Sequence, residues 1–173
     1  LFLLKTGFVL WLLGPSSAGK TTIGHTLVKK LRKNGSPVMH FDGDEIRAFF
    51  GDRLGFTDDD RLQAVTTCAY LANKTADAGI DVVVSALTAR EEARQYVRNT
   101  VKNLSIAYLK CPIETCKKRD SRGLYGKAAR GEIDANTLIG LNSPYPVPCE
   151  PEITIDTSKH SIAESVDILE TYI

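Results

Sequence analysis

The chain has 173 residues, 43% of them hydrophobic, which is enough for one compact domain with a full core. Its 22 basic and 21 acidic residues leave a formal net charge of +1, so no general attraction to nucleic acid or to a membrane is expected. Four cysteines without a CxxC pair, and only three histidines, argue against a zinc site and are typical of reduced thiols in a cytosolic protein. We expect one cytoplasmic domain over residues 1–173 that acts on a small molecule.

Apolar runs alternate with segments of helical spacing along the whole chain. In chain order we expect a strand at 8–13, a helix at 21–33, a strand at 38–42, a helix at about 58–79, a strand at 81–86, a helix at 91–102, strands at 105–110 and 152–156, and a final helix. On that final helix one face is predicted to carry Ile162, Val166, Leu169 and Ile173. Strands separated by helices predict an α/β fold with a parallel sheet, whose ligands bind at the carboxyl ends of the strands.

Residues 119–150 do not fit this alternation. The segment has weak periodicity and many Gly, Pro, Lys and Arg residues. Its length and composition are typical of a mobile lid over a site rather than of a core element.

The stretch "GPSSAGKTT", residues 14–22, matches the phosphate-binding pattern G-x-x-x-x-G-K-[ST] and lies between a predicted strand and a predicted helix. Gly14 and Gly19 allow the turns that aim backbone N–H groups at phosphate oxygens, and the helix adds its N-terminal partial charge. Lys20 is expected to bridge the terminal phosphates as a catalytic cation, and the Thr21 hydroxyl to bind Mg²⁺. The predicted ATP site comprises Gly14, Ser16, Ser17, Ala18, Gly19, Lys20, Thr21 and Thr22.

Such a loop also occurs in GTP-dependent switches, which read guanine with an N-K-x-D sequence. The nearest candidate, "NKTAD" at 73–77, is one residue too long and lies inside a predicted helix. The sequence "DRLG" at 52–55 resembles a switch motif but is short enough to arise by chance. A chain that only binds nucleotide is a further alternative. Phosphoryl transfer remains the favoured interpretation.

The sequence "FDGDEIR", residues 41–47, follows the second predicted strand and should face the terminal phosphate. Asp44 is placed to accept the proton of an acceptor hydroxyl or to hold the waters of Mg²⁺. The alternative for Asp44 is a helix N-cap, and Asp42 has the same two options. We expect Asp44 to be the catalytic base.

Several cations bracket these segments. They are Arg47, Arg61, Arg119, Arg122 and Lys127. Each alone is ordinary on a surface, but as a group they are typical of clamps for an anionic acceptor and for the phosphates of ATP.

In these segments the sequence resembles the adenylylsulfate (APS) kinase family, which phosphorylates the 3′-hydroxyl of adenosine 5′-phosphosulfate. The matching stretches are "GPSSAGKTT", "DGDEIR", "LGFTDDDR", "ADAGIDVVVSA", "RDSRGLYGKA", "GEI", "NSPY" and "PEITIDTS", which cover almost the whole chain in order. The resemblance implies a P-loop kinase fold with a five-stranded parallel sheet, ATP and Mg²⁺ as cofactors, and a nucleotide acceptor; relatives of this kind are often homodimers. It implies Asp44 as the base, Asp42, Arg47, Phe56 and Arg61 at the acceptor, Arg119 near the adenine of ATP, and Lys127 in the closing lid.

The chain departs from the family pattern mostly on the acceptor side. After the arginine that corresponds to Arg61 and two further residues, the family pattern continues with "NIRR". This chain has Ala64 and Thr66 there in place of an Asn and an Arg. Leu138 stands where the family carries a Phe that stacks on the acceptor's adenine. The family's "SPY" is replaced by residues 88–90, "TAR", and the Asn of "DGDN" is Glu45.

These departures leave two acceptors open. One is APS itself, with Arg90 or Arg94 replacing a missing cation and Leu138 at the acceptor. The other is a different nucleotide, such as cytidine diphosphoramidate, whose smaller base needs less stacking surface. Lost stacking and a lost charged hydrogen bond would each cost about 1–3 kcal/mol of acceptor binding.

Overall fold

The computed structural model describes residues 6–55, 57–120, 122–134, 139 and 144–173. Its elements follow in the order β1 (Val9–Leu13), α1 (Lys20–Lys33), β2 (Val38–Asp42), α2 (Gly43–Phe50), a 3₁₀ turn (Gly51–Arg53), α3 (Asp58–Asp77), β3 (Asp81–Ser85), α4 (Glu91–Thr100), β4 (Leu104–Lys110), α5 (Ile113–Arg119), α6 (Leu124–Ala129), β5 (Ile153–Asp156) and α7 (Ile162–Tyr172). The strands and long helices expected from periodicity are confirmed within two residues at each end. Helix α2 was considered only through the alternative that Asp42 or Asp44 caps a helix, and helices α5 and α6 were not expected.

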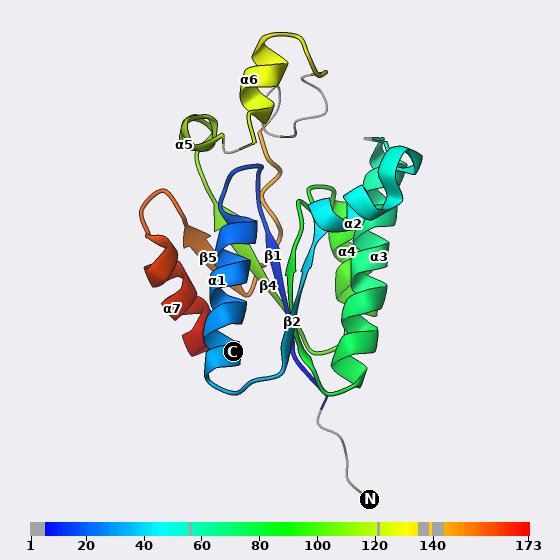
Figure 1. The fold of residues 1–173 in the computed structure, drawn as a ribbon, viewed down its shortest axis with the longest axis vertical. Coiled ribbons are helices and arrows are strands. Elements are labelled where there is room, and N and C mark those ends of the chain that lie inside the picture. Colours follow the sequence, from blue (N-terminus) through cyan, green and yellow to red (C-terminus); the bar gives the residue numbers. More distant parts are fainter. Residues whose placement is uncertain (1–5, 56, 121, 135–138, 140–143) are drawn as a thin grey trace, which may run out of the picture.

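The five strands form one parallel sheet in the order β2-β3-β1-β4-β5. Helices α1 and α7 cover one face of the sheet, and α3 and α4 cover the other (Figure 1). The α/β class, the P-loop kinase architecture and the five-stranded parallel sheet are therefore confirmed. In the part of the chain that the structure describes, no helix has the length and apolar character needed to cross a membrane.

Strand β1 is buried along its whole length because it is the central strand and each face of it packs into a different core. Val9, Trp11 and Leu13 belong to the core under α3 and α4. Leu10 and Leu12 belong to the core under α1 and α7. A strand that is buried on both faces reads as a continuous apolar run rather than an alternating one.

Glycine turns end two of the helices. Gly35 follows α1 with φ of 89°, and Gly79 follows α3 with φ of 81°, a region that favours glycine. The amides after each helix bond back to its last turn, as in Ser36 N–H to the Leu31 carbonyl (3.1 Å) and Ile80 N–H to the Thr75 carbonyl (3.3 Å).

The prediction for the last helix is only half right. Val166 and Leu169 are buried against α1 and the sheet, but Ile162 is 47% exposed and Ile173 is 38% exposed. Ile162 is the first residue of α7 and Ile173 follows its end, so neither lies over the layer that the middle of the helix covers.

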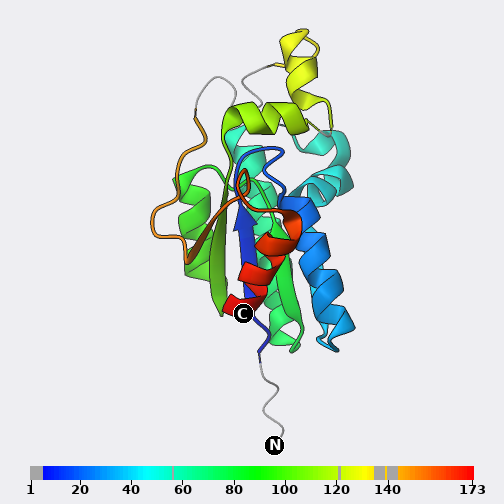
Figure 2. The same cartoon turned by 90° about the vertical axis from the view of Figure 1, so that its left-hand side faces the viewer.

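All five strands end at the same edge of the sheet, where the phosphate loop follows β1. Helices α5 and α6 lie beyond this edge (Figures 1 and 2). The predicted lid segment thus contains α6 and begins at the end of α5. The ligand-binding edge is where the sequence placed it.

Candidate active site

A cleft of about 1150 Å³ opens at the carboxyl edge of the sheet. Its lining comes from the phosphate loop, the start of α2, the first half of α3, the β3–α4 loop, the lid segment and the β5–α7 loop. The predicted residues that line it are Ser16, Ser17, Ala18, Gly19, Lys20, Thr21, Thr22, Asp42, Asp44, Arg47, Arg61 and Arg119. The cleft therefore brings together the predicted donor residues other than Gly14 and three of the six predicted acceptor residues, Asp42, Arg47 and Arg61.

The phosphate loop has the backbone geometry that its glycines predicted. Gly14 has φ of 152° and Gly19 has φ of 100°, and a Cβ atom at Gly14 would lie 2.5 Å from the carbonyl oxygen of Leu109. Ser17 also adopts a positive φ, of 61°. Successive turns of this kind expose backbone N–H groups to one concave side, which binds phosphate oxygens. Gly14 does not itself line the cleft, so it serves the loop by close packing on β4.

Lys20 lies folded over its own loop. Its ammonium group donates hydrogen bonds to the backbone carbonyls of Gly14 (2.8 Å) and Pro15 (2.7 Å). Burial lowers the pKa of Lys20 to about 8, while the nearby carboxylates of Asp44 and Asp42 act in the opposite direction. The cation is thus held inside the loop, close to the predicted base.

Asp42 connects the phosphate loop to α2. Its side chain is only 3% exposed; one carboxylate oxygen accepts a hydrogen bond from the Thr21 hydroxyl (2.6 Å) and the other accepts one from the Asp44 N–H (2.8 Å). Asp42 is therefore the N-cap of α2, and the alternative that Asp44 caps this helix is wrong. The cap leaves the Asp44 side chain available to the cleft.

The oxygen atoms of Thr21 and Asp42 suit a magnesium ion. Both are hard oxygen donors, they are already within hydrogen-bond distance, and they face the loop that would hold phosphates. Among the described residues no group of three or more His, Cys, Asp or Glu side chains is arranged to hold a metal ion. Magnesium at a nucleotide site needs fewer protein ligands, because phosphate oxygens and waters complete its shell.

Asp44 lies in the first turn of α2 and its side chain is about half exposed in the cleft. It forms an ion pair with the Nη1 of Arg122, which comes from the segment between α5 and α6. The pair joins residues 78 positions apart across the cleft. The base predicted from the sequence therefore meets a cation of the lid segment.

Arg119 binds the β5–α7 loop. Its guanidinium donates to the carbonyl (2.5 Å) and the hydroxyl (3.3 Å) of Thr157, whose hydroxyl in turn donates to the carbonyl of Ala18 (2.9 Å). Thr157 was missed by the sequence analysis. The chain of contacts fixes Arg119 relative to the phosphate loop, which agrees with a position on the donor side of the cleft.

The lid segment is tied to the same loop. The hydroxyl of Tyr125 in α6 donates to the carbonyl of Ser16 (3.0 Å), and Asp120 accepts hydrogen bonds from the N–H groups of Tyr125 (3.1 Å) and Gly126 (2.9 Å). Lys127 of the same helix is exposed and does not line the cleft, so the structure does not bring it to the site. The "RDSRGLYGKA" stretch places its Tyr rather than its Lys on the phosphate loop.

On the acceptor side, the predicted arginines come from two helices, since α2 carries Arg47 and α3 carries Arg61. Arg47 donates to the carbonyl of Gly55, and burial and the neighbouring Arg47 lower the pKa of Arg61. The predicted residues Phe56 and Leu138 lie outside the described residues. Ala64 lines the cleft where the family pattern has Asn.

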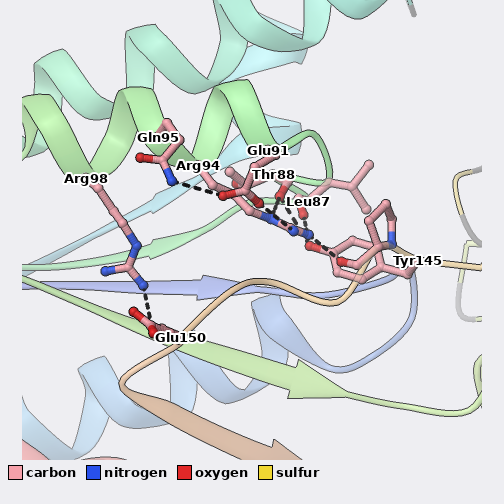
Figure 3. A network of polar contacts seen from close by, with 9 residues as sticks. Leu87, Thr88, Glu91, Arg94, Gln95, Arg98, Tyr145 and Glu150 are labelled. Carbon is pink, nitrogen blue, oxygen red and sulfur yellow. Dashed lines mark hydrogen bonds and ion pairs between the residues drawn. The ribbon is translucent and has the colours of Figure 1, made fainter.

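Arg94 does not replace the missing cation as the sequence allowed. It is 3% exposed, and it donates to the carbonyls of Thr88 (2.9 Å) and Pro146 (2.5 Å) and pairs with Glu91 (3.3 Å). Its guanidinium lies 5.4 Å from the ring centre of Tyr145 (Figure 3). Arg94 is thus a structural cation that supports the wall of the cleft from behind.

Tyr145 completes this support. Its hydroxyl donates to the carbonyls of Leu87 (2.6 Å) and Thr88 (3.3 Å) (Figure 3). Its ring stacks on that of Tyr108. Thr88 adopts φ of 40° and accepts a hydrogen bond from the indole N–H of Trp11 (2.9 Å). The β3–α4 loop, which lines the cleft, is therefore held by three buried side chains behind it.

The candidate guanine sequence has a different role. Asn73 lies in α3, donates to the carbonyl of Thr100 (2.6 Å) and accepts from the N–H of Lys102 (3.0 Å). These contacts fasten α3 to the end of α4, and Asn73 does not line the cleft. The structure gives no support to a guanine-reading switch.

Comparisons with known proteins agree with this geometry. A family model described as Adenylylsulphate kinase matches residues 6–156. The chain is 39% identical over 162 residues to an adenylyl-sulfate kinase of Rippkaea orientalis, covering 94% of this chain and 88% of that protein. It is 38% identical over 170 residues to one of Clostridium acetobutylicum, covering 98% and 84%.

A solved structure of the Mycobacterium tuberculosis APS kinase CysC in complex with AMPPNP and APS superimposes with a TM-score of 0.89. That chain is 29% identical, and the match covers 96% of each chain. The family match spans the phosphate loop, the Asp42–Asp44 turn, the first half of α3 and the β3–α4 loop, which are among the segments that line the cleft. The chain therefore belongs to the adenylylsulphate kinase family.

Proposed function

We propose that the protein transfers the γ-phosphoryl group of ATP to the 3′-hydroxyl of adenosine 5′-phosphosulfate. The observation that carries this proposal is the arrangement of one cleft in which the phosphate loop, the Thr21–Asp42 pair and the Asp44 side chain meet. Family membership and the match to an APS kinase solved with APS support the same substrates.

Each described group has a defined task in this reaction. The loop amides and Lys20 bind the phosphates of ATP and stabilise negative charge that moves onto the leaving ADP oxygen. Asp44 accepts the proton of the 3′-hydroxyl while the 3′-oxygen of the acceptor bonds to the γ-phosphorus and the bond between the γ-phosphorus and the ADP oxygen breaks. Arg122 forms an ion pair with Asp44. When the acceptor separates these two side chains, the guanidinium of Arg122 binds the negatively charged phosphoryl group during its transfer.

Magnesium is the proposed metal, held by the Thr21 hydroxyl with Asp42 behind it. A bound ion would neutralise part of the negative charge of the ATP phosphates. Asp42 also holds the Asp44 amide, so the residue that supports the metal ligand fixes the position of the base.

A kinase of the same fold that acts on another nucleotide, such as cytidine diphosphoramidate, is the second candidate. It is favoured by Ala64, which lines the cleft and offers no hydrogen bond where the family pattern has Asn. A smaller base would fill less of the cleft and require fewer polar partners.

One assay separates the candidates. ATP consumption is measured with APS, cytidine nucleotides, adenylates and no acceptor, using Lys20→Ala as the inactive reference. Turnover that depends on APS supports the first proposal, and turnover with a cytidine nucleotide alone supports the second. Turnover near normal in Lys20→Ala would contradict the donor assignment itself.

Leu138→Phe is a second test of the acceptor. It restores the family residue, and it should lower the KM for APS if APS is the substrate. An unchanged KM, together with phosphorylation of a cytidine nucleotide by the unmodified protein, would favour the alternative.

A homodimer and a cytoplasmic location stay predictions from the sequence. Light scattering after size-exclusion chromatography tests the first, and fractionation of cells that produce the chain tests the second.

A further inference from the structure

Arg90 and Asp58 form an ion pair at the acceptor wall of the cleft. The Nε and Nη2 atoms of Arg90 lie 3.0 Å and 2.9 Å from the two carboxylate oxygens of Asp58, so the contact is bidentate. Both residues line the cleft, and their side chains are 58% and 62% exposed. Arg90 precedes α4 on the β3–α4 loop, and Asp58 is the first residue of α3. The pair therefore bridges two walls of the same opening.

Two further arginines, Arg47 and Arg61, also line the cleft. Arg61 lies one turn beyond Asp58 on α3, and the pKa of Arg61 is lowered by burial and by the nearby charges of Arg47 and Arg90. The Asp58 carboxylate acts on Arg61 in the opposite direction. Arg47, Arg61 and Arg90 all line the cleft, and like-charged side chains that lie close together form an environment that an anion would stabilise.

The bond between Arg90 and Asp58 is easily exchanged. An exposed ion pair gives a folded protein little net stability, since both groups are well hydrated when they separate. A planar guanidinium fork binds carboxylate, phosphate and sulfate oxygens through the same two-pronged geometry. The carboxylate of Asp58 therefore occupies the place of an anionic oxygen pair, and a ligand with more negative charge can displace it.

Arg90 is also distinctive in the sequence. It stands in "TAR", where the family pattern has "SPY", and the chain carries Ala64 and Thr66 where that pattern has Asn and Arg. Ala64 lines the cleft without a polar group, whereas the Thr66 hydroxyl bonds to the carbonyl of Gln63 (2.9 Å) and Thr66 does not line the cleft. The chain thus lacks the Asn side chain of the family pattern on the α3 wall of the cleft and carries a cation, Arg90, on the β3–α4 wall.

We propose that Arg90 is an acceptor-binding residue of this chain, whose guanidinium binds the phosphosulfate group of the acceptor, and that Asp58 holds it in place until the acceptor displaces the carboxylate. This inference rests on the proposed function, because it assumes an anionic nucleotide acceptor. Asp58 is then a positioning residue, because its competition for the Arg90 guanidinium raises the KM for the acceptor.

The test compares the KM for APS with the KM for ATP in single and double variants of the full chain. Arg90→Ala should raise the KM for APS about 10-fold or more, as expected for loss of a charged hydrogen bond, and leave the KM for ATP within about twofold. Arg90→Lys keeps the positive charge but loses the two-pronged guanidinium. Its KM for APS should lie between that of the wild type and that of Arg90→Ala. The Arg90 side chain makes no cap bond to α4, so its removal does not take away a helix cap.

Asp58→Asn isolates the second part of the proposal. It should lower the KM for APS severalfold in the wild-type background and have no such effect in the Arg90→Ala background. Lys102→Ala is the control, because it removes one positive charge from an exposed ion pair with Asp77 that lies outside the cleft. Its kinetics should match those of the wild type.

The outcomes are distinct. An unchanged KM for APS in Arg90→Ala, or an equal rise in the KM for ATP, would overturn the role of Arg90. The same effect of Asp58→Asn with and without Arg90 would overturn the role of Asp58. A wild-type protein that does not phosphorylate APS contradicts the proposed function before any variant is compared.

Discussion

Because Lys20 is buried in its own loop, ATP binding should be coupled to proton uptake. Burial lowers the pKa of Lys20 to about 8 in the free protein, and the phosphates of ATP must raise it again when they bind the ammonium group. With a free pKa of about 8, uptake is ~0.1 proton at pH 7, ~0.5 at pH 8 and ~0.9 at pH 9. The affinity for ATP should therefore fall as the pH rises through this range.

Isothermal titration calorimetry measures this uptake directly, in pairs of buffers with different enthalpies of ionisation. Lys20→Arg is the control, because a guanidinium stays protonated throughout and its uptake curve contains only the contributions of other groups. The difference between the two curves should follow a single titration centred near pH 8. Asp44→Asn should move that centre to lower pH, since the Asp44 carboxylate raises the pKa of Lys20.

The lowered pKa of Lys20 also makes the free energy of unfolding depend on pH. Between pH 8 and the usual value of 10.5 the unfolded chain binds more protons at this lysine than the folded one does, so the lysine's contribution to the free energy of unfolding rises with pH in that window. Identical uptake curves for the wild type and Lys20→Arg would refute the reasoning. So would a difference that does not change between pH 7 and pH 9.

Three further results are expected. Asp44→Asn should lower kcat at least ~100-fold and keep the Kd for ATP, as steady-state and binding measurements will show; loss of ATP binding would indicate a metal or structural role. Gly14→Ala should lower the melting temperature and abolish ATP binding, because its new Cβ would lie 2.5 Å from the Leu109 carbonyl oxygen at φ of 152°; an unchanged melting curve would contradict this. Tyr145→Phe should cost about 1–2 kcal/mol, or ~2–8 °C in the melting temperature, because the Leu87 carbonyl loses its donor; a shift below 1 °C would show that water replaces it.

Local patterns predicted the geometry of the phosphate loop and its place in the cleft. The phosphate loop is nine consecutive residues, so its glycines, Lys20 and Thr21 reach their places through one turn. The Asp42–Asp44 turn was also readable, but which carboxylate caps α2 was not, because both spacings suit a cap. The structure decides it through the hydrogen bond from the Asp44 N–H to Asp42.

The acceptor half could not be predicted in the same way. Arg90 meets Asp58 across 32 residues, and Tyr145 meets Leu87 across 58. Such partners depend on how helices pack on the sheet, which no local spacing records. Arg94 illustrates the difficulty, because a cation in an amphipathic helix is normally solvated and here it is buried against carbonyls and a Tyr ring.

Strand β1 also limits how this protein can change. Its odd-numbered residues fill one core, its even-numbered residues fill the other, and the phosphate loop begins one residue later. An insertion or deletion of a single residue in this strand would exchange the contents of both cores at once. Substitutions in α3 and the β3–α4 loop can therefore change the acceptor-binding wall of the cleft without disturbing β1. The phosphate loop, in contrast, depends on the register of β1, so its position cannot change independently of both cores.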